Sequence, residues 1–317
     1  MTAANWDVRR FASLPSTNDW LLERAQDGAP AGIVAVADHQ SAGRGRMGRR
    51  WDAPPGRCLL VSVLLRPVAP LAGLFTCTAA VALATSDACR LLTGVEPGVK
   101  WPNDLVIGDE KVAGVLAESD GAAPGGRPGS VAVVVGIGCN LDWHPPGATS
   151  LAAHAKAPVG RDELLEAMLG GVAARVGLLD TEAGRRATLA ELRRRCVTLG
   201  RTVRVESSVG TVVGVARDLD GDGRLVVATA AGDVAVAAGD VVHLRPAPPA
   251  ASHAVHAVQA EHAVQAEHAV HAVQAVQAEQ AVLAEQAVQA EKAVQAEKAV
   301  QAEQAEQAVR AANGRGR

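Results

Sequence analysis

Short apolar runs separated by turn-forming residues mark the first part of the chain and predict a sheet. Segments 33–37 and 57–65 have the length and composition of strands, and the second ends just before Pro67. Segment 131–135 is apolar at every position, which is typical of a fully buried strand. We expect residues 6–11 to add a short edge strand.

Longer segments carry helical patterns. Four polar residues at 16–19 precede Trp20–Ala25, so they are expected to cap a helix, and a capping turn can also point hydroxyl and amide groups into a pocket. Segment 71–92 has few charges and predicts a helix that is buried on most sides. Segments 162–179 and 186–196 predict amphipathic helices.

Pro102 interrupts the apolar segment Val99–Ile107. Proline has no backbone N–H for a strand ladder, and it biases Trp101 towards extended geometry. We therefore expect one strand that is broken by a kink at Pro102 and aims side chains into a site. A tight turn at 108–110 and a returning strand at 111–118 should follow.

Five short strands are expected near the end of the globular part, and they predict a small β-barrel; they are 202–206, 210–217, 224–228, 233–237 and 241–244. Residues 218–223 should form the hairpin turn between two of them. This turn resembles part of a calcium loop, but Thr229 stands where such a loop carries glutamate. We expect no metal there.

The chain changes character after Pro246. From His253 to Arg310 it repeats Ala-Val-Gln-Ala-Glu at six-residue intervals, and these residues are strong helix formers. Six residues advance a helix by about 240°, so successive valines fall on three faces and form no apolar stripe. The tail is expected to be an isolated helix or a low-complexity extension.

Composition and charge limit the class of protein. The chain has 317 residues and is 48% hydrophobic, which is enough for a large domain and a small one. Its formal net charge of −3 argues against a nucleic-acid coat or a membrane-surface protein. Five cysteines without a C-x-x-C pair indicate neither a disulfide framework nor a zinc site. Lacking a signal-like or membrane-length apolar run, the chain is expected in the cytoplasm.

The most informative stretch is Asp38–Trp51, which places four arginines and three glycines between two expected strands. Glycines let the backbone approach a ligand, and guanidinium groups bind phosphate or carboxylate oxygens. The stretch also matches G-x-G-x-x-G, but residues 52–56 cannot form the helix that a dinucleotide site requires. An RNA-binding Arg-Gly segment is the other alternative, although such segments usually repeat. The pattern favours a loop that closes over an anion.

Lys111 begins an otherwise apolar strand. A solvated strand-end lysine is the simplest explanation of such a residue when it stands alone. The same domain also carries Asn103, Asp104 and the arginine-rich loop, so we favour a functional role for Lys111. Gly136 and Gly138 allow close approach of a ligand or of a neighbouring strand, and packing is the commoner reason for such glycines.

Together these motifs resemble the biotin protein ligase family over residues 6–245. The matching elements are Ser16-Thr17-Asn18, Gln40, Gly43-Arg44-Gly45-Arg46-Met47-Gly48-Arg49, Lys100-Trp101-Pro102-Asn103-Asp104, Lys111-Val112-Ala113-Gly114-Val115-Leu116 and Gly136-Ile137-Gly138-Cys139-Asn140. One minor departure is Cys139, where the family usually has an aliphatic residue.

The resemblance implies an α+β fold: a mixed-sheet catalytic domain of the biotin/lipoate ligase type (class II synthetase-like) at 1–190, an SH3-like β-barrel at 191–246, and a tail at 247–317. It implies that ATP and biotin react with Mg²⁺ to give biotinyl-5′-AMP, and that a carrier lysine then accepts biotin. A lipoate ligase or octanoyltransferase is the nearest rival, and a catalytically silent biotin sensor or a nucleic-acid-binding module is a rival of another class.

Site residues also follow from the resemblance. Those expected at biotin are Ser16, Thr17, Asn18, Gln40, Arg44, Gly45, Arg46 and Lys111. Those expected at ATP are Arg49, Trp51, Lys100, Asn103, Asp104, Gly138 and Asn140. Lys111 and Arg46 are the expected catalytic residues, and Asp104 is the expected indirect contact to Mg²⁺.

Partners follow in the same way. The expected protein partner is a biotin carboxyl carrier domain of an acyl-CoA carboxylase. Some ligases of this kind carry an N-terminal winged helix-turn-helix, but too few residues precede position 11 here to form one. We therefore expect binding to neither DNA nor membranes, and a monomer or homodimer.

Overall fold

The computed structural model describes residues 6–67, 73–119, 131–207 and 210–244. The turn expected at 121–129 and the repeat tail at 247–317 lie outside these residues. Within the described ranges, no helix is both long enough and apolar enough to cross a membrane.

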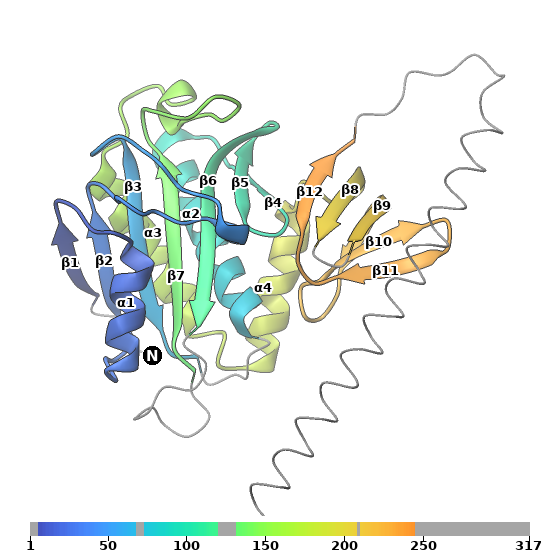
Figure 1. The fold of residues 1–317 in the computed structure, drawn as a ribbon, viewed down its shortest axis with the longest axis horizontal. Helices are drawn as coiled ribbons and strands as arrows, with labels where there is room; N and C mark the ends of the chain where they lie inside the picture. The colour runs from blue at the N-terminus through green and yellow to red at the C-terminus, as the bar shows by residue number, and fades with distance from the viewer. Residues whose placement is uncertain (1–5, 68–72, 120–130, 208–209, 245–317) are drawn as a thin grey trace, which may run out of the picture. The chain divides into compact units, whose positions relative to one another are not determined.

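A seven-stranded mixed sheet forms the larger part of the structure (Figure 1). Its strands are β1 Asp7–Phe11, β2 Ile33–Ala37, β3 Cys58–Leu65, β4 Gly98–Lys100, β5 Asp104–Ile107, β6 Glu110–Ser119 and β7 Val133–Asn140. Their order is β1-β2-β3-β7-β6-β5-β4, with β1 parallel to β2 and the other pairs antiparallel. The mixed sheet and the edge position of β1 are as the sequence predicted.

Helices cover both faces of this sheet. The helices are α1 Thr17–Gln26, α2 Gly73–Thr93, α3 Arg161–Val176 and α4 Glu182–Arg195. Strand β3 is buried along its whole length, as a strand between two covered faces must be. Its Val61 and Val63 pack in the main core with α2 and α3, whereas Leu64 packs with Leu21 of α1 on the other face.

The segment Val99–Ile107 differs from its prediction. It is a hairpin, because β4 and β5 pair antiparallel with Lys100 opposite Asp104. The expectation of a single kinked strand was therefore wrong. The reason lies outside the segment: Trp101 at the tip is 2% exposed, donates its backbone N–H to Thr198 Oγ1 (3.0 Å), and donates its indole N–H to the Gly223 carbonyl (3.0 Å). These contacts anchor the tip where Pro102 ends the ladder.

The five C-terminal strands form a second sheet in the order β11-β10-β9-β8-β12. They are β8 Thr202–Ser207, β9 Gly210–Leu219, β10 Leu225–Thr229, β11 Gly232–Val236 and β12 Asp240–His243. The expected hairpin turn joins β9 to β10, where Asp220 Oδ1 accepts the N–H groups of Asp222 and Arg224 (both 2.9 Å). Buried residues of this sheet, such as Val203 and Leu225, belong to the main core cluster.

The five cysteines are buried free thiols, and buried cysteines pack as small hydrophobic side chains. Burial raises the pKa of the Cys58 and Cys77 thiols to about 12. These thiols are therefore protonated and act in packing.

Candidate functional site

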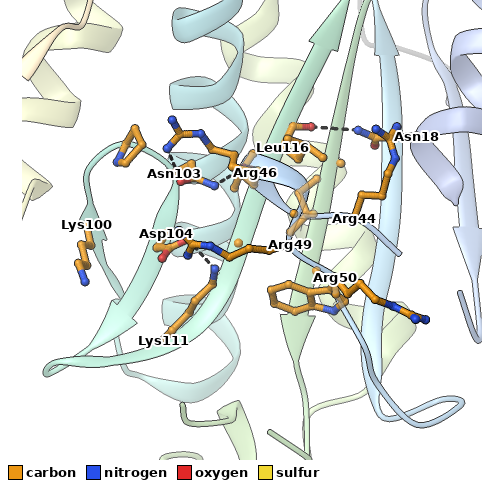
Figure 2. Close-up of a pocket in the computed structure, with 18 of the residues that line it drawn as sticks. Asn18, Arg44, Arg46, Arg49, Arg50, Lys100, Asn103, Asp104, Lys111 and Leu116 are labelled. Atoms are coloured by element: carbon orange, nitrogen blue, oxygen red, sulfur yellow. Dashed lines mark hydrogen bonds and ion pairs between the residues drawn. The ribbon is translucent and has the colours of Figure 1, made fainter. Parts of the chain in front are cut away.

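A cavity of about 290 Å³ lies over the middle of the seven-stranded sheet. The start of α1, the arginine-rich loop, the β4–β5 hairpin, β6, β7 and β12 all contribute to its lining. Figure 2 shows lining residues of the first four of these elements. The residues singled out in the sequence that line it are Ser16, Thr17, Asn18, Gln40, Arg44, Gly45, Arg46, Arg49, Trp51, Lys100, Asn103, Asp104, Lys111 and Gly138. The fold thus brings separate motifs together at one cavity.

Asn140 is the exception among the predicted site residues. It is 1% exposed, and its amide donates to the Thr149 carbonyl (2.8 Å). It therefore fastens the segment after β7, and it is not among the residues that line the cavity.

Uncharged polar groups form one end of the cavity. Ser16 is the N-cap of α1, and its side chain accepts the Asp19 N–H (3.3 Å), which confirms the predicted cap. The first helical turn then presents Thr17 and Asn18, each 4% exposed. Gln40 Oε1 accepts the Thr17 backbone N–H (2.7 Å) and lies 3.0 Å from Thr17 Oγ1. This end suits a neutral ligand group that both donates and accepts hydrogen bonds.

The arginine-rich loop folds back on itself beside this end. Gly45 N–H donates to the Arg49 carbonyl (2.7 Å), and Met47 between them takes the left-handed conformation with φ 57°. A side chain at Gly43 would meet the Trp51 carbonyl at 2.4 Å, so glycine is required there. The tight turn aims several guanidinium groups at the cavity, as Figure 2 shows for Arg46 and Arg49.

The arginines that line the cavity have partners within the protein. Arg44 pairs with Glu118 (2.9 Å) and with Asp19. Arg49 pairs with Asp240 of β12. These contacts keep the guanidinium groups oriented. Because the arginine side chains remain partly exposed, a ligand anion could replace the carboxylates as their partner.

Arg46 reaches deepest among these arginines. It donates to Asn103 Oδ1 (3.3 Å) and to the Gly239 carbonyl (3.4 Å), so it links the loop to the β4–β5 hairpin and to the C-terminal sheet. Burial lowers the pKa of Arg46, and the nearby Asp104 opposes that effect. The guanidinium remains charged because an arginine pKa lies far above neutrality.

Lys111 lies at the start of β6 and forms an ion pair with Asp104 of β5 (2.7 Å). Its Nζ is also 5.4 Å from the centroid of the Trp51 ring. The Trp51 ring lies on Gly138, where an added Cβ would come within 2.4 Å of Trp51 Cε2. Gly138 therefore makes room for the packing of the Trp51 side chain, and packing is the commoner of the reasons that the sequence left open.

Trp51 Nε1 is buried, and no hydrogen-bond partner for it occurs among the described residues. A buried indole N–H without an acceptor is costly, so a ligand acceptor would stabilise it. This atom marks the part of the cavity beside Lys111 as a second binding region.

The C-terminal sheet supplies residues that the motifs did not indicate. Asp240, Val241 and Val242 of β12 line the cavity. The neighbouring His243 lies 3.0 Å from an Arg201 guanidinium nitrogen and 3.2 Å from Thr198 Oγ1. Burial, together with Lys100 and Arg201, lowers the pKa of His243 to about 4. The ring is therefore neutral at pH 7.

The lining carries few metal ligands. Within the described ranges no three His, Cys, Asp or Glu side chains come together as a metal-binding group. Asp104 and Asp240 are the carboxylates among the lining residues. One or two carboxylates fit a Mg²⁺ ion that is held mainly by phosphate oxygens and water, and they do not fit a metal bound by protein ligands alone.

Comparison with known proteins gives consistent matches. Residues 10–140 match the biotin/lipoate A/B protein ligase family, and residues 198–244 match the biotin protein ligase C terminal domain. The biotin–[acetyl-CoA-carboxylase] ligase of Mycobacterium tuberculosis is 39% identical over 74% of this chain and 88% of its own length. The ligase of the same description from Paracoccus denitrificans is 33% identical over 73% of this chain and 98% of its own.

Solved structures agree with these matches. The biotin protein ligase of Aquifex aeolicus, in complex with biotin and ATP, superposes with a TM-score of 0.63 at 25% identity. The superposition covers 76% of this chain and 99% of that chain. The predicted fold class, a mixed-sheet catalytic part with a small C-terminal β part, is confirmed.

Proposed function

Because the chain belongs to the biotin protein ligase family, we propose that it ligates biotin to a lysine of a carrier domain of an acyl-CoA carboxylase, with ATP as the energy source. The observation that carries the proposal is the division of the cavity. Thr17 and Gln40 offer neutral hydrogen-bonding groups at one end, and Arg46 and Lys111 offer positive charge beyond it. Biotin has the matching order of groups, a neutral ureido ring followed by a chain that ends in a carboxylate.

The first step joins two anions. A carboxylate oxygen of biotin attacks the α-phosphorus of ATP, the bond to the β-phosphate oxygen breaks, and pyrophosphate leaves with that electron pair. No protein nucleophile is needed, so positioning and positive charge are the main requirements. Lys111 would lie where the carboxylate meets the α-phosphate, and Arg46 would cover the same region from the loop.

The nucleotide belongs on the Trp51 side of the cavity in this proposal. The unpartnered Trp51 indole N–H would donate to the nucleotide, and Gly138 leaves the room that the Trp51 ring needs. Lys100, Asn103 and Arg49 are proposed phosphate or adenosine contacts. Asp104 is the carboxylate that would contact Mg²⁺ indirectly, while phosphate oxygens hold most of the ion, and Mg²⁺ neutralises phosphate charge when bound. We propose no direct nucleotide contact for Asn140, because its side-chain amide donates to the Thr149 carbonyl.

In the second step the amine of a carrier lysine attacks the acyl carbon of the adenylate. The acyl–phosphate bond breaks, AMP leaves, and the amine loses a proton as the amide forms. Arg44 and Gly45 of the arginine-rich loop would cover the adenylate until the carrier arrives, which protects it from water.

We propose a catalytic domain at 1–190, an SH3-like domain at 191–246 and a separate tail at 247–317. We also propose a cytoplasmic enzyme that acts on a carrier protein, binds no DNA, and is a monomer or homodimer.

The test is biotin-dependent exchange of labelled pyrophosphate into ATP by the full chain. Exchange with biotin, and much less with lipoate or octanoate, is the expected result. Exchange with lipoate instead would favour the lipoate ligase alternative. No exchange with any of the three acids, from folded protein with magnesium, would contradict the ligase function and leave the biotin sensor. Transfer of biotin to a purified carrier domain then tests the second step.

A further inference from the structure

Four oxygen atoms form a chain under the neutral end of the cavity. Asn18 Oδ1 lies 2.6 Å from Ser62 Oγ, Ser62 Oγ lies 2.7 Å from Thr17 Oγ1, and Thr17 Oγ1 lies 3.0 Å from Gln40 Oε1. Ser62 is on β3, is fully buried, and lies beneath the residues that line the cavity. Three contacts therefore connect four oxygens, and each contact needs one proton to be a hydrogen bond.

Both ends of this chain are acceptors. The Asn18 amide nitrogen faces the Leu116 carbonyl (3.2 Å) and a Glu118 carboxylate oxygen (2.7 Å), which only accept, so its Oδ1 must point to Ser62. Gln40 Oε1 faces the Thr17 backbone N–H (2.7 Å), which only donates, so this oxygen is also fixed as an acceptor. Only the hydroxyls of Ser62 and Thr17 carry protons, and two protons cannot fill three contacts.

The contact without a proton is the one at the cavity. Two oxygens that face each other without a proton repel most strongly when they are close and buried. The contacts of Ser62 are the two shorter ones, and Ser62 is fully buried. Gln40 Oε1 already accepts the Thr17 N–H. When the two protons are placed on the two shorter contacts, Ser62 donates to Asn18, Thr17 donates to Ser62, and no proton lies between Thr17 Oγ1 and Gln40 Oε1.

We propose that Ser62 is a positioning residue that orients the Thr17 hydroxyl, so that Thr17 Oγ1 and Gln40 Oε1 present a pair of acceptors that only a donor on the ligand can satisfy. The inference rests on the proposed function, in which that donor is a ureido ring N–H of biotin. A neutral ring with oxygen in place of this N–H would add a third acceptor to the pair. Ser62 thus contributes to specificity without touching the substrate.

The surroundings keep the chain of oxygens in this order. Glu118, which fixes the Asn18 amide, is itself paired with Arg44 (2.9 Å). A Cβ at Gly136 would lie 2.2 Å from Asn18 Oδ1 and 3.2 Å from Ser62 Oγ, so glycine leaves the space that this contact occupies. The arrangement therefore extends from the arginine-rich loop to the floor of the cavity.

The test measures the affinity of the full chain for biotin and for analogues whose ureido N–H groups are replaced, one at a time, by a ring oxygen. Isothermal titration gives the ratio of the two affinities for wild type and for Ser62→Ala. In the variant, the Thr17 hydroxyl loses Ser62 as acceptor and turns to Gln40. We expect biotin to bind about tenfold more weakly and the preference for the N–H form to fall about tenfold, with ATP affinity changed less than about twofold.

Ser86→Ala is the matched control. Ser86 is also fully buried and donates one hydrogen bond, to the Pro97 carbonyl (2.7 Å), at a distance from the cavity lining. It should lose a comparable contact and keep both the biotin affinity and the preference for the N–H form. A general loss of rigidity would change both variants alike.

Asn18→Ala provides a second route if Ser62→Ala does not fold. It leaves the Ser62 hydroxyl free to donate to Thr17, so Thr17 turns to Gln40 and the same preference should be lost. If wild type binds biotin and either folded variant keeps the preference for the N–H form, the role of Ser62 is overturned and the proposed function stands. Wild type that does not bind biotin would contradict the proposed function and this inference with it.

Discussion

Replacing Lys111 by alanine separates its contribution to chemistry from its contribution to folding. The Lys111–Asp104 ion pair is partly exposed, at 36% and 26% of the two side chains. Pairs of this kind contribute at most about 1 kcal/mol to folding because solvent screens them. A loss of that size would lower the melting temperature of a domain of this length by only about 2–4 °C. The variant should therefore fold.

The expected cost to the reaction is larger. In the proposed first step, Lys111 compensates negative charge where the carboxylate and the α-phosphate meet. The other lysine among the residues that line the cavity is Lys100, on the β4–β5 hairpin. Removing one preoriented group of this kind typically costs about 10²–10³ in rate, or about 2.7–4 kcal/mol. The rate of biotin-dependent pyrophosphate exchange should fall by that factor.

The assay compares exchange rates and thermal melting for wild type, Lys111→Ala and two further variants. Lys111→Arg keeps the charge on a different geometry and should recover only part of the rate. Lys156→Ala is the control, because Lys156 is exposed and lies outside the lining of this cavity. A folded Lys111→Ala variant whose exchange rate stays within about threefold of wild type would refute the reasoning from charge.

Three further predictions follow from other contacts. Gly138→Ala should displace the Trp51 ring, at a cost in stability of about 1–3 kcal/mol. It should weaken ATP binding about tenfold and leave biotin binding unchanged, which titration with each ligand measures. An unchanged ATP affinity would remove Trp51 from the nucleotide site. Arg46→Gly should release the adenylate early, so that lysines of a bystander protein become biotinylated; labelling confined to the carrier domain would argue against a covering role. The pKa of His243 is lowered from its ordinary value of 6.5 to about 4 in the folded protein. Between these two pH values the unfolded chain therefore binds more protons than the folded chain. The free energy of unfolding that depends on His243 is thus greatest above pH 6.5 and decreases as the pH falls towards 4. His243→Gln should therefore flatten the decline of melting temperature in that range, and an unchanged profile would assign the decline to other groups.

Elements whose signals are local could be predicted from the sequence. The cap at Ser16, the edge strand β1 and the turn at Asp220 each depend on a few neighbouring residues, and each is found where it was expected. The arrangement of the arginine-rich loop, Asn103, Asp104 and Lys111 around one cavity could also be predicted, because the resemblance covers whole motifs in their order along the chain.

Features that depend on distant partners could not be predicted. The sequence of 99–107 shows that Pro102 interrupts a strand, but the reversal at that point depends on Thr198 and Gly223, which accept hydrogen bonds from Trp101. Asp240 carries no motif and reaches Arg49 only because the C-terminal sheet lies beside the loop. The role inferred for Ser62 required the distances between oxygen atoms, since a serine in an apolar strand has no distinctive pattern.

The anchoring of Trp101 bears on how this enzyme could be divided or recombined. A chain truncated before Thr198 would lose the acceptors of both Trp101 N–H groups, leaving two buried donors unsatisfied within the hairpin that borders the cavity. It would also expose apolar side chains that share one core with Val203 and Leu225. The small sheet is therefore not an exchangeable module. A sheet grafted from a relative would satisfy Trp101 only if its backbone placed a carbonyl where that of Gly223 lies and if it kept a hydroxyl at the position of Thr198.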